Sequence, residues 1–340
     1  MYLLKNCVWE LTLACCFSCK YCGSNGGEPR ENELTTEECL QVSEALSKMG
    51  CERVSLIGGE VFMRKDWDQI TESLIKNGIS TSIITNGYCL SNKTIRRIKE
   101  LQLESVAISL DGPVCIHDKY RNKGSFDRAI QTLLNLSENW IPVSVITTLN
   151  AENIDYLEEL YRILLKYPIS AWQLQACSPM GNAKSNAVSY AFDHKIVLDF
   201  VGTHILEAPF TLGVADNIGY YTEKEGYLRG NLNGLGFFRG CQAGISSIGI
   251  DSIGNVRGCE SMYCNHFIEG NLRTQSLEEI WNNPNGFSYN RHFTVSRLTG
   301  ECRNCRYGSV CAGGCRSYNY FTQKKMYESV FCVKANSTKA

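Results

Sequence analysis

The sequence predicts an α/β fold, in which a parallel sheet or partial barrel of βα repeats precedes a small cysteine-rich domain. From residue 7 to about 205, short apolar runs rich in Val, Ile and Thr alternate with amphipathic stretches, a pattern typical of buried parallel strands separated by helices. After about residue 235 helical periodicity fades, and Gly and Cys become frequent. Because this region has few long apolar runs, we expect metal ligation to supply part of its folding free energy.

Strands and helices can be placed along the chain. The segment 35–50 opens with a Thr35–Glu38 capping-box pattern and ends at a glycine, and 153–168 has Leu and Ile at helical spacing before a proline. Strands that alternate with helices in this way predict a parallel sheet. In the C-terminal region, "GIDSIGNVRG" predicts a hairpin with its turn at Gly254–Asn255. The six predicted strands are 7–13, 53–57, 80–85, 105–110, 142–148 and 170–176.

Composition excludes several classes of partner. The chain has 340 residues and a formal net charge of −1, so no basic surface for nucleic acid or membrane is expected. The N-terminus lacks the features of a secretory signal, and no apolar stretch has the roughly 18 residues of a transmembrane helix. We therefore expect a cytoplasmic protein. Eighteen cysteines in such a protein favour metal ligation over disulfides.

Four cysteines lie within "CCFSCKYC", residues 15–22. Cys16, Cys19 and Cys22 resemble the start of a ferredoxin motif, but the fourth Cys and the Pro that continue that motif are missing. Cys15, Cys19 and Cys22 give C-x3-C-x2-C on a loop directly after a strand, which could hold a 4Fe–4S cluster by three irons and leave the fourth open. A zinc site would normally have a nearby His or a second C-x2-C pair. We expect Cys16 to be a bystander turned into the barrel wall.

Placed after the first strand of a βα-repeat domain, this C-x3-C-x2-C loop resembles the radical S-adenosylmethionine (SAM) superfamily, whose fold is a partial (βα)6 TIM-like barrel. In that family the open iron chelates SAM, and an electron from the cluster cleaves it to a 5′-deoxyadenosyl radical. Other matching segments fall at the ends of predicted strands, where active sites of such barrels collect. The resemblance implies that SAM contacts Tyr21 near its adenine, Gly58, Gly59 and Glu60 at its amino group, Thr85 and Asn86 after the third strand, and Ser109 and Arg121 near its ribose and carboxylate.

The spacing of the C-terminal cysteines resembles the SPASM domain, which carries auxiliary 4Fe–4S clusters in radical enzymes that modify peptides and proteins. With the first cluster, the resemblance implies three 4Fe–4S clusters. The family pattern assigns Cys302, Cys305, Cys311 and Cys332 to an outer cluster, and Cys241, Cys259 and Cys315 to an inner one.

The inner cluster would lack one ligand, because complete family sites have an eighth cysteine shortly after the position of Cys241. Either one iron of this cluster is open, which could bind a substrate thiolate, or Cys264 is the fourth ligand.

Two further residues are candidate catalytic groups. Glu260 directly follows Cys259, where sulfatase-maturing members of the family have an Asp that acts as general base; it could instead be an ordinary loop carboxylate. Cys177 is expected at the barrel mouth, where a thiol could return a hydrogen atom to a substrate radical, although a core thiol is the simpler interpretation. Small buried side chains are also predicted for Cys7, Cys39, Cys51, Cys89 and Cys115.

The resemblance divides the chain into a radical SAM barrel (1–205), a connecting segment (206–237) and an auxiliary-cluster domain (238–340). It implies an enzyme that abstracts a substrate hydrogen, and the favoured reaction is oxidation of a ribosomally made peptide or protein to a crosslink, thioether or dehydrogenated product. The alternative is a sugar or aminocyclitol dehydrogenase or epimerase. A non-catalytic electron carrier would not need the Gly-Gly-Glu segment.

The implied partners are the substrate and a reductant such as flavodoxin or ferredoxin. Many peptide-modifying members carry a leader-binding domain before the barrel, and here the first strand is expected by about residue 7. A peptide substrate would therefore need a separate leader-peptide recognition protein, or it would bind through the barrel and the 205–235 segment.

Overall fold

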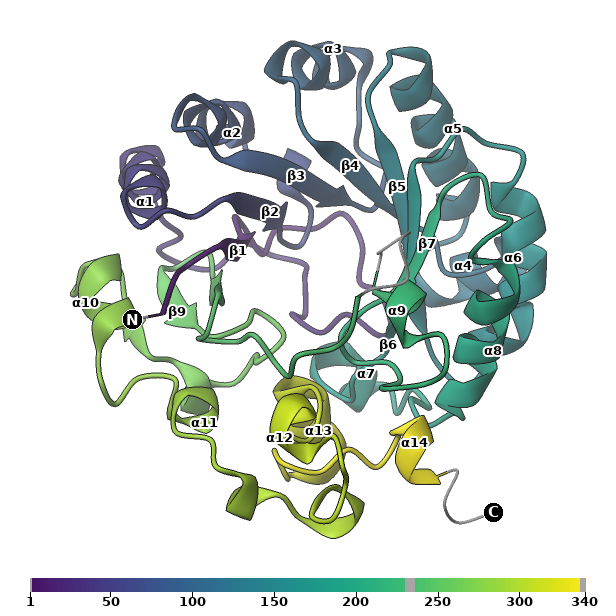
Figure 1. Ribbon diagram of the computed structural model, residues 1–340. Helices are drawn as coiled ribbons and strands as arrows, with labels where there is room; N and C mark the ends of the chain where they lie inside the picture. Colours follow the sequence, from purple (N-terminus) through teal and green to yellow (C-terminus); the bar gives the residue numbers. More distant parts are fainter. Residues whose placement is uncertain (1, 230–235, 337–340) are drawn as a thin grey trace.

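A single curved sheet organises the computed structural model, which describes residues 2–229 and 236–336. Within these residues the strand order is β10-β9-β8-β1-β2-β3-β4-β5-β6-β7 (Figure 1). Neighbouring strands from β8 through β1 to β7 are parallel, and β9 and β10 are antiparallel to their neighbours. The strands are β1 (Asn6–Glu10), β2 (Arg53–Ile57), β3 (Ser80–Thr85), β4 (Ser105–Ser109), β5 (Val143–Leu149), β6 (Ala171–Ala176), β7 (Thr211–Val214), β8 (Ser247–Ile250), β9 (Asn255–Arg257) and β10 (Gly270–Asn271).

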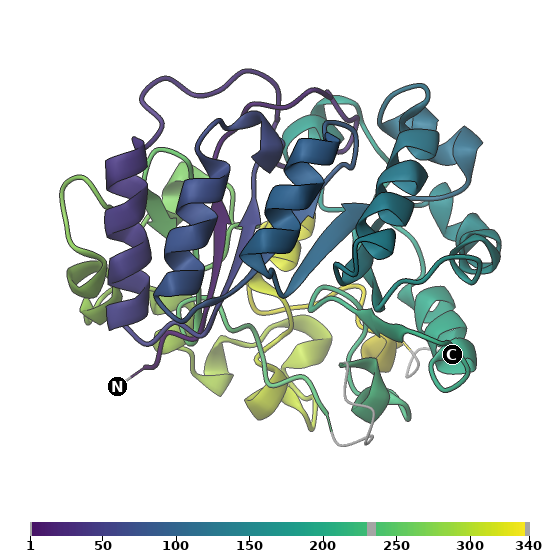
Figure 2. The same cartoon turned by 90° about the horizontal axis from the view of Figure 1, so that it is seen from above.

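Helices cover the convex side of this sheet, and the C-terminal segment lies across its open side, away from α2 and α3 (Figures 1 and 2). The expected α/β class with a partial barrel is therefore confirmed. Among the described residues, every helix is too short or too polar to cross a membrane. The helices are α1 (Thr36–Lys48), α2 (Trp67–Lys76), α3 (Asn92–Leu101), α4 (Val114–Tyr120), α5 (Ser125–Glu138), α6 (Leu157–Leu164), α7 (Gly181–Ser185), α8 (His194–His204), α9 (Glu225–Leu228), α10 (Leu277–Asn282), α11 (Ser288–Arg291), α12 (Gly308–Cys311), α13 (Arg316–Gln323) and α14 (Val333–Asn336), with single 3-10 turns at Val61–Met63, Asn153–Tyr156, Asn265–Phe267, Val295–Arg297 and Gly300–Cys302.

The two faces of the parallel strands differ in chemistry because side chains alternate along a strand. Residues such as Trp9 and Leu56 share a buried apolar core with helix residues such as Leu74. The opposite face is polar. The Ser55 and Ser82 hydroxyls lie 3.1 Å apart, and the Gln175 amide donates to the Thr148 hydroxyl at 3.0 Å. The concave side of the barrel is therefore a polar wall.

The sheet extends beyond the six predicted strands at both edges. At one edge β7, in the predicted connecting segment, pairs with β6; its sequence "TLGV" is too short to stand out as an apolar run. At the other edge β8, from the cysteine-rich region, pairs with β1 through Asn6↔Ser247 and Trp9↔Ile250. The proposed domain boundaries stay a prediction, and residues 230–235 and 337–340 lie outside the described part of the chain.

Local signals are mostly placed as expected. The capping box of Thr35 and Glu38 forms at the start of α1. The predicted hairpin turn at Gly254–Asn255 is wrong by one step: the turn is Asp251–Gly254, and Asn255 is the first residue of β9. The cause is the Asp251 carboxylate, which accepts hydrogen bonds from the backbone N–H groups of Ile253 (3.2 Å) and Asn255 (2.9 Å) and so closes the turn early.

Glycine at position 249 lets the chain after β9 cross the inner face of β8. A Cβ atom there would lie 2.3 Å from the Glu260 nitrogen and 2.7 Å from its Cα. Both are backbone atoms, which cannot rotate away, so only glycine fits without a shift of the hairpin.

We expect Gly249→Ala to lower the free energy of unfolding by about 1–3 kcal/mol, the usual cost of overpacking. Gly27→Ala is the matched control, because a Cβ at Gly27 would meet nothing within 4 Å. Chemical denaturation of the two variants beside the parent measures the difference, and equal stability of both would contradict this role for Gly249.

Candidate functional site

The first cysteine loop crosses the C-terminal ends of the barrel strands. Cys19 is buried, and Cys15 and Cys22 are half-buried. Both half-buried residues border Gly26, since a Cβ at Gly26 would lie 3.3 Å from the Cys15 Cβ and 3.7 Å from the Cys22 sulfur. The backbone N–H of Phe17 donates to the Cys15 sulfur at 3.4 Å, and that of Gly26 donates to the Cys22 sulfur at 3.3 Å. Such donors suit thiolate ligands, because hydrogen bonds to sulfur stabilise its charge.

The ligand sets suit clusters better than single ions. Among the described residues, no three His, Cys, Asp or Glu side chains converge on one point as ligands of a metal ion. A closed zinc site needs such convergence. The thiolates of a 4Fe–4S cluster each bind a different iron and stand further apart.

A short helix after β6 holds the first cysteine loop in place. The Asn182 backbone N–H donates to the Cys22 carbonyl at 2.8 Å, and its side-chain amide donates to the Cys19 carbonyl at 3.1 Å. One turn later the Asn186 amide donates to the Lys20 carbonyl at 3.0 Å. These two asparagines were missed from the sequence, although they are four residues apart, with Asn182 in α7 and Asn186 as its C-cap.

Gly58 and Gly59 allow the same loop to approach β2 closely. A Cβ at Gly58 would lie 2.4 Å from the Thr12 carbonyl oxygen, and one at Gly59 would lie 2.4 Å from that of Ala14. Backbone hydrogen bonds run from Gly59 N–H to Thr12 and from Glu60 N–H to Ala14, at 2.8 and 2.7 Å. The Gly-Gly pair is thus required by backbone contact before any cofactor is considered.

Glu60 binds two of the other predicted SAM-contacting residues, Thr85 and Asn86. Its buried carboxylate accepts hydrogen bonds from the Thr85 hydroxyl at 2.8 Å and from the Asn86 backbone N–H at 2.9 Å. Burial raises the pKa of Glu60 to about 7. The carboxylate is therefore engaged within the protein, and we infer that it positions the loop after β3.

Tyr21 and Arg121 meet at Asp111, which the sequence analysis missed. The Arg121 Nε donates to an Asp111 carboxylate oxygen at 2.5 Å, and the Tyr21 hydroxyl donates to the same oxygen. Burial disfavours ionisation of Asp111, but Arg121 and then His117 hold its pKa below the ordinary value. Ser109 is half-buried at the end of β4 just before this cluster. The signal in the sequence is an aspartate two residues after Ser109, at the end of the fourth predicted strand.

Cys177 lies beside Tyr21. It is buried with Tyr21 and Tyr120 in one apolar group, and burial raises the pKa of its thiol to about 12. The residue is thus held in the thiol form, the form that carries a hydrogen atom. Of the other cysteines expected to be buried, Cys7, Cys39 and Cys51 are buried, whereas Cys89 is half-buried and Cys115 is exposed. Cys115 lies in the first turn of α4, on the opposite side from the buried residues Ile116, His117 and Tyr120.

The cysteines assigned to the outer cluster share one cavity of about 490 Å³. Tyr221 and Tyr307 also line it, with stacked rings whose centroids are 4.2 Å apart. A common cavity is the arrangement that four ligands of one cluster require. The four residues are Cys302, Cys305, Cys311 and Cys332.

The three cysteines assigned to the inner cluster (the inner set) are half-buried and lie near one another. Burial and then the nearby thiols of Cys241 and Cys259 raise the pKa of Cys315. The three side chains therefore lie close enough to interact electrostatically. Cys264 follows Cys259 in the same loop, immediately before the 3-10 turn Asn265–Phe267, and is half-buried. Its assignment as fourth ligand stays open.

Glu260 is buried beside the inner set. Within the described residues neither of its carboxylate oxygens has a hydrogen-bond partner. Burial and then repulsion by Glu10 raise its pKa well above the ordinary value. A buried carboxyl without any protein partner is uncommon in folded proteins and marks a place where a ligand group is expected.

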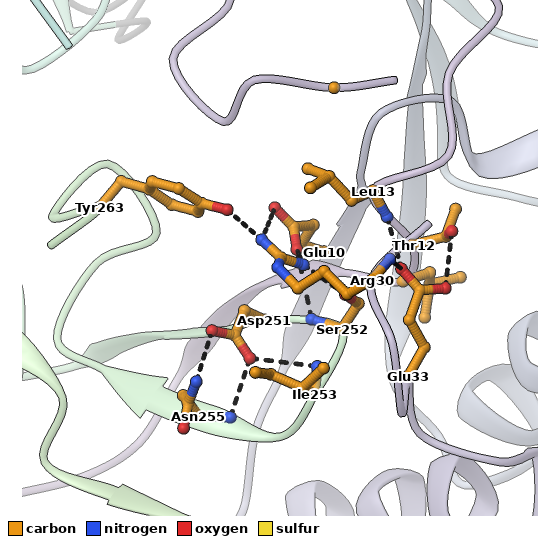
Figure 3. Close-up of polar contacts among 12 residues, drawn as sticks. Glu10, Thr12, Leu13, Arg30, Glu33, Asp251, Ser252, Ile253, Asn255 and Tyr263 are labelled. Carbon is orange, nitrogen blue, oxygen red and sulfur yellow. Dashed lines mark hydrogen bonds and ion pairs between the residues drawn. The ribbon is translucent and has the colours of Figure 1, made fainter. Parts of the chain in front are cut away.

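Arg30 connects the first cysteine loop to the auxiliary-cluster region, as Figure 3 shows. Its guanidinium pairs with Glu10 at the end of β1 and donates to the Ser252 hydroxyl in the β8–β9 turn. It also donates to the hydroxyl of Tyr263, which lies between Cys259 and Cys264. One half-buried arginine thereby ties the loop of the first cluster to the loop of the inner cluster.

We expect Arg30→Met to lower the free energy of unfolding by about 3–5 kcal/mol, because it leaves Glu10 buried without its cation. Arg97→Met is the control: Arg97 makes ion pairs with Asp68 and Glu72 on the helical surface, which are worth about 1 kcal/mol or less. Urea unfolding of both variants checks this, and a loss for Arg30→Met no larger than for Arg97→Met would refute it.

Comparison with known proteins agrees with this geometry. The model of the radical SAM superfamily matches residues 9–164, and the model of the SPASM iron-sulfur cluster-binding domain matches residues 241–306; together they span more than half of the chain. The AdoMet-dependent heme synthase of Oleidesulfovibrio alaskensis is 25% identical over 339 residues, covering 96% of this chain and 86% of that protein. The mycofactocin maturase MftC of Mycobacterium tuberculosis is 26% identical over 323 residues, covering 92% and 78%.

Solved structures share the fold at lower identity. Streptococcus suis SuiB bound to S-adenosylmethionine superposes with a TM-score of 0.79 at 16% identity, over 98% of this chain and 78% of that chain. The enzyme anSMEcpe with bound AdoMet gives a TM-score of 0.73 at 17% identity, over 98% and 91%. This chain belongs to the radical SAM superfamily and carries a C-terminal SPASM iron–sulfur domain.

Proposed function

We propose that this radical SAM enzyme oxidatively modifies a ribosomally made peptide or protein. The observation that carries the proposal is the combination of the first cysteine loop, held at the barrel mouth, with the contact of Arg30 to Tyr263 in the loop of the inner-cluster cysteines. Relatives of similar fold support a peptide substrate, since SuiB has been solved with its precursor peptide SuiA and anSMEcpe with a bound peptide. MftC is named a maturase.

The chain's own residues have separable tasks in this proposal. Cys15, Cys19 and Cys22 would hold the first of three clusters, and the Gly58-Gly59-Glu60 segment would bind the SAM amino group. When bound, the cluster and SAM supply the 5′-deoxyadenosyl radical that removes a substrate hydrogen atom. Tyr21, Thr85, Asn86, Ser109 and Arg121 surround SAM, either by contact or, as Glu60 does, by positioning those that make it.

Glu260 is the proposed proton-transfer group of the substrate site. It lies next to an inner-cluster ligand, and neither of its oxygens has a partner among the described residues. It can exchange a proton with the substrate without first breaking a protein hydrogen bond.

A small-molecule substrate is the second candidate. The observation that favours it is the buried Cys177 thiol beside Tyr21, which suits hydrogen-atom return in a sugar or aminocyclitol epimerase. The heme synthase relative, which matches almost the whole chain, also shows that close sequence likeness does not require a peptide substrate. Deuterium taken up from solvent at an otherwise unchanged carbon supports epimerisation, whereas a mass loss of two hydrogens supports crosslinking or dehydrogenation.

We expect the anaerobically reconstituted, dithionite-reduced protein to cleave SAM to 5′-deoxyadenosine. Cys15→Ala should abolish this cleavage because a cluster held by two thiolates is lost, and Cys16→Ala should retain it. Chromatography of 5′-deoxyadenosine and iron content measure both effects. No cleavage by the parent protein would sink the enzymatic proposal, and loss in Cys16→Ala with retention in Cys15→Ala would transfer the ligand role to Cys16.

A further inference from the structure

Cys16 and Cys89 lie in contact beside the first cysteine loop. Their sulfur atoms are 3.0 Å apart, although the residues come from different segments, one in the cluster loop and one after β3. Both are half-buried. Cys16 was expected to be a bystander turned into the barrel wall, and Cys89 was expected to be a small buried side chain. The structure corrects the second expectation, since Cys89 is half-buried and contacts Cys16.

Neighbouring contacts hold this thiol pair together. Phe17 and Tyr88, the residues next to the two cysteines, pack their rings with centroids 5.0 Å apart. The Asn86 side-chain amide donates to the Cys16 sulfur at 3.4 Å and is 3.9 Å from the sulfur of Cys15. The pair is therefore a built feature of the loop junction, and the proposed function uses neither of its thiols.

We propose that Cys16 and Cys89 form a reversible disulfide when the enzyme is exposed to dioxygen, an inference that rests on the proposed cluster at Cys15. Two thiols at this separation need only a small movement to reach a sulfur–sulfur bond of roughly 2 Å. Each thiol loses one proton and one electron as the bond forms, and dioxygen takes up both electrons and both protons to become hydrogen peroxide. A dithiol reductant restores the pair by thiol–disulfide exchange.

This disulfide would keep the proposed ligands of the first cluster free of disulfide bonds. A Cys16–Cys89 bond fastens the first cysteine loop to the segment after β3 and leaves Cys15, Cys19 and Cys22 as thiols. If oxygen destroys the first cluster, the bond occupies the thiol adjacent to Cys15, which would otherwise be free to pair with a ligand. The three ligands then remain available for a new cluster.

Mapping of disulfides tests this inference. Reconstituted holoenzyme is exposed to air, its free thiols are alkylated, and the non-reduced digest is analysed by mass spectrometry. We expect the Cys16–Cys89 link to be the main disulfide of the loop. If this link is absent, or if links among Cys15, Cys19 and Cys22 exceed it, the proposal is overturned.

Recovery of the cluster is the second measurement. After air exposure, reduction and reconstitution, the parent protein and the control Cys115→Ser, which changes an exposed thiol elsewhere, should regain their iron. Cys89→Ser and Cys16→Ser should each regain several-fold less. Equal recovery in all four proteins would overturn the protective role. Disulfide mapping and iron content do not depend on SAM cleavage, so a failure of the proposed enzymatic function would be distinguishable from a failure here.

Discussion

The close approach of the first cysteine loop to the Gly58–Gly59 turn is the contact on which the site depends. The loop's carbonyl oxygens lie where a side chain on either glycine would have to be, so backbone packs directly on backbone. Further contacts connect this point to the other residues of the site. Glu60 follows the glycines and binds Thr85 and Asn86, and Asn86 reaches back to the sulfurs of Cys15 and Cys16. These contacts lead from the loop through the glycines, Glu60 and Asn86 back to the loop. The protein therefore holds the loop in place without any cofactor.

A second constraint joins the barrel to the cysteine-rich region. β1 pairs on one side with β2 and on the other with β8, so the strand that leads into the first cysteine loop also carries the auxiliary hairpin. Arg30 adds a side-chain tie at the same place, between Glu10 of β1 and Tyr263 of the inner-cluster loop (Figure 3). Both cluster loops are therefore attached to β1, which limits their movement relative to each other.

The sequence allowed the repetitive part of this structure to be predicted, and motifs at strand ends allowed much of the site to be proposed. Strands 53–57 and 80–85 end where their apolar runs end, because a parallel strand buried by helices needs an uninterrupted apolar face. β7 and the exact hairpin turn were missed, since a four-residue strand has little pattern and the turn is set by the Asp251 side chain. Asp111, Asn182 and Arg30 were missed for another reason. Each acts by contacting a residue distant in sequence, and a sequence pattern does not show which distant residues come into contact.

The buried carboxylates of the site follow one physical rule: each needs either a cation or several hydrogen-bond donors. Asp111 has Arg121, and Glu60 has the donors of Thr85 and Asn86. Glu10 has Arg30, and Asp251 has Arg257. Glu260 stands apart from these four, since it is equally buried but its two oxygens meet no donor in the described residues. By the same rule, burial of the Glu260 carboxyl group without a hydrogen-bond donor raises its pKa well above the ordinary value, whereas a cation or donors stabilise the charge of the other four.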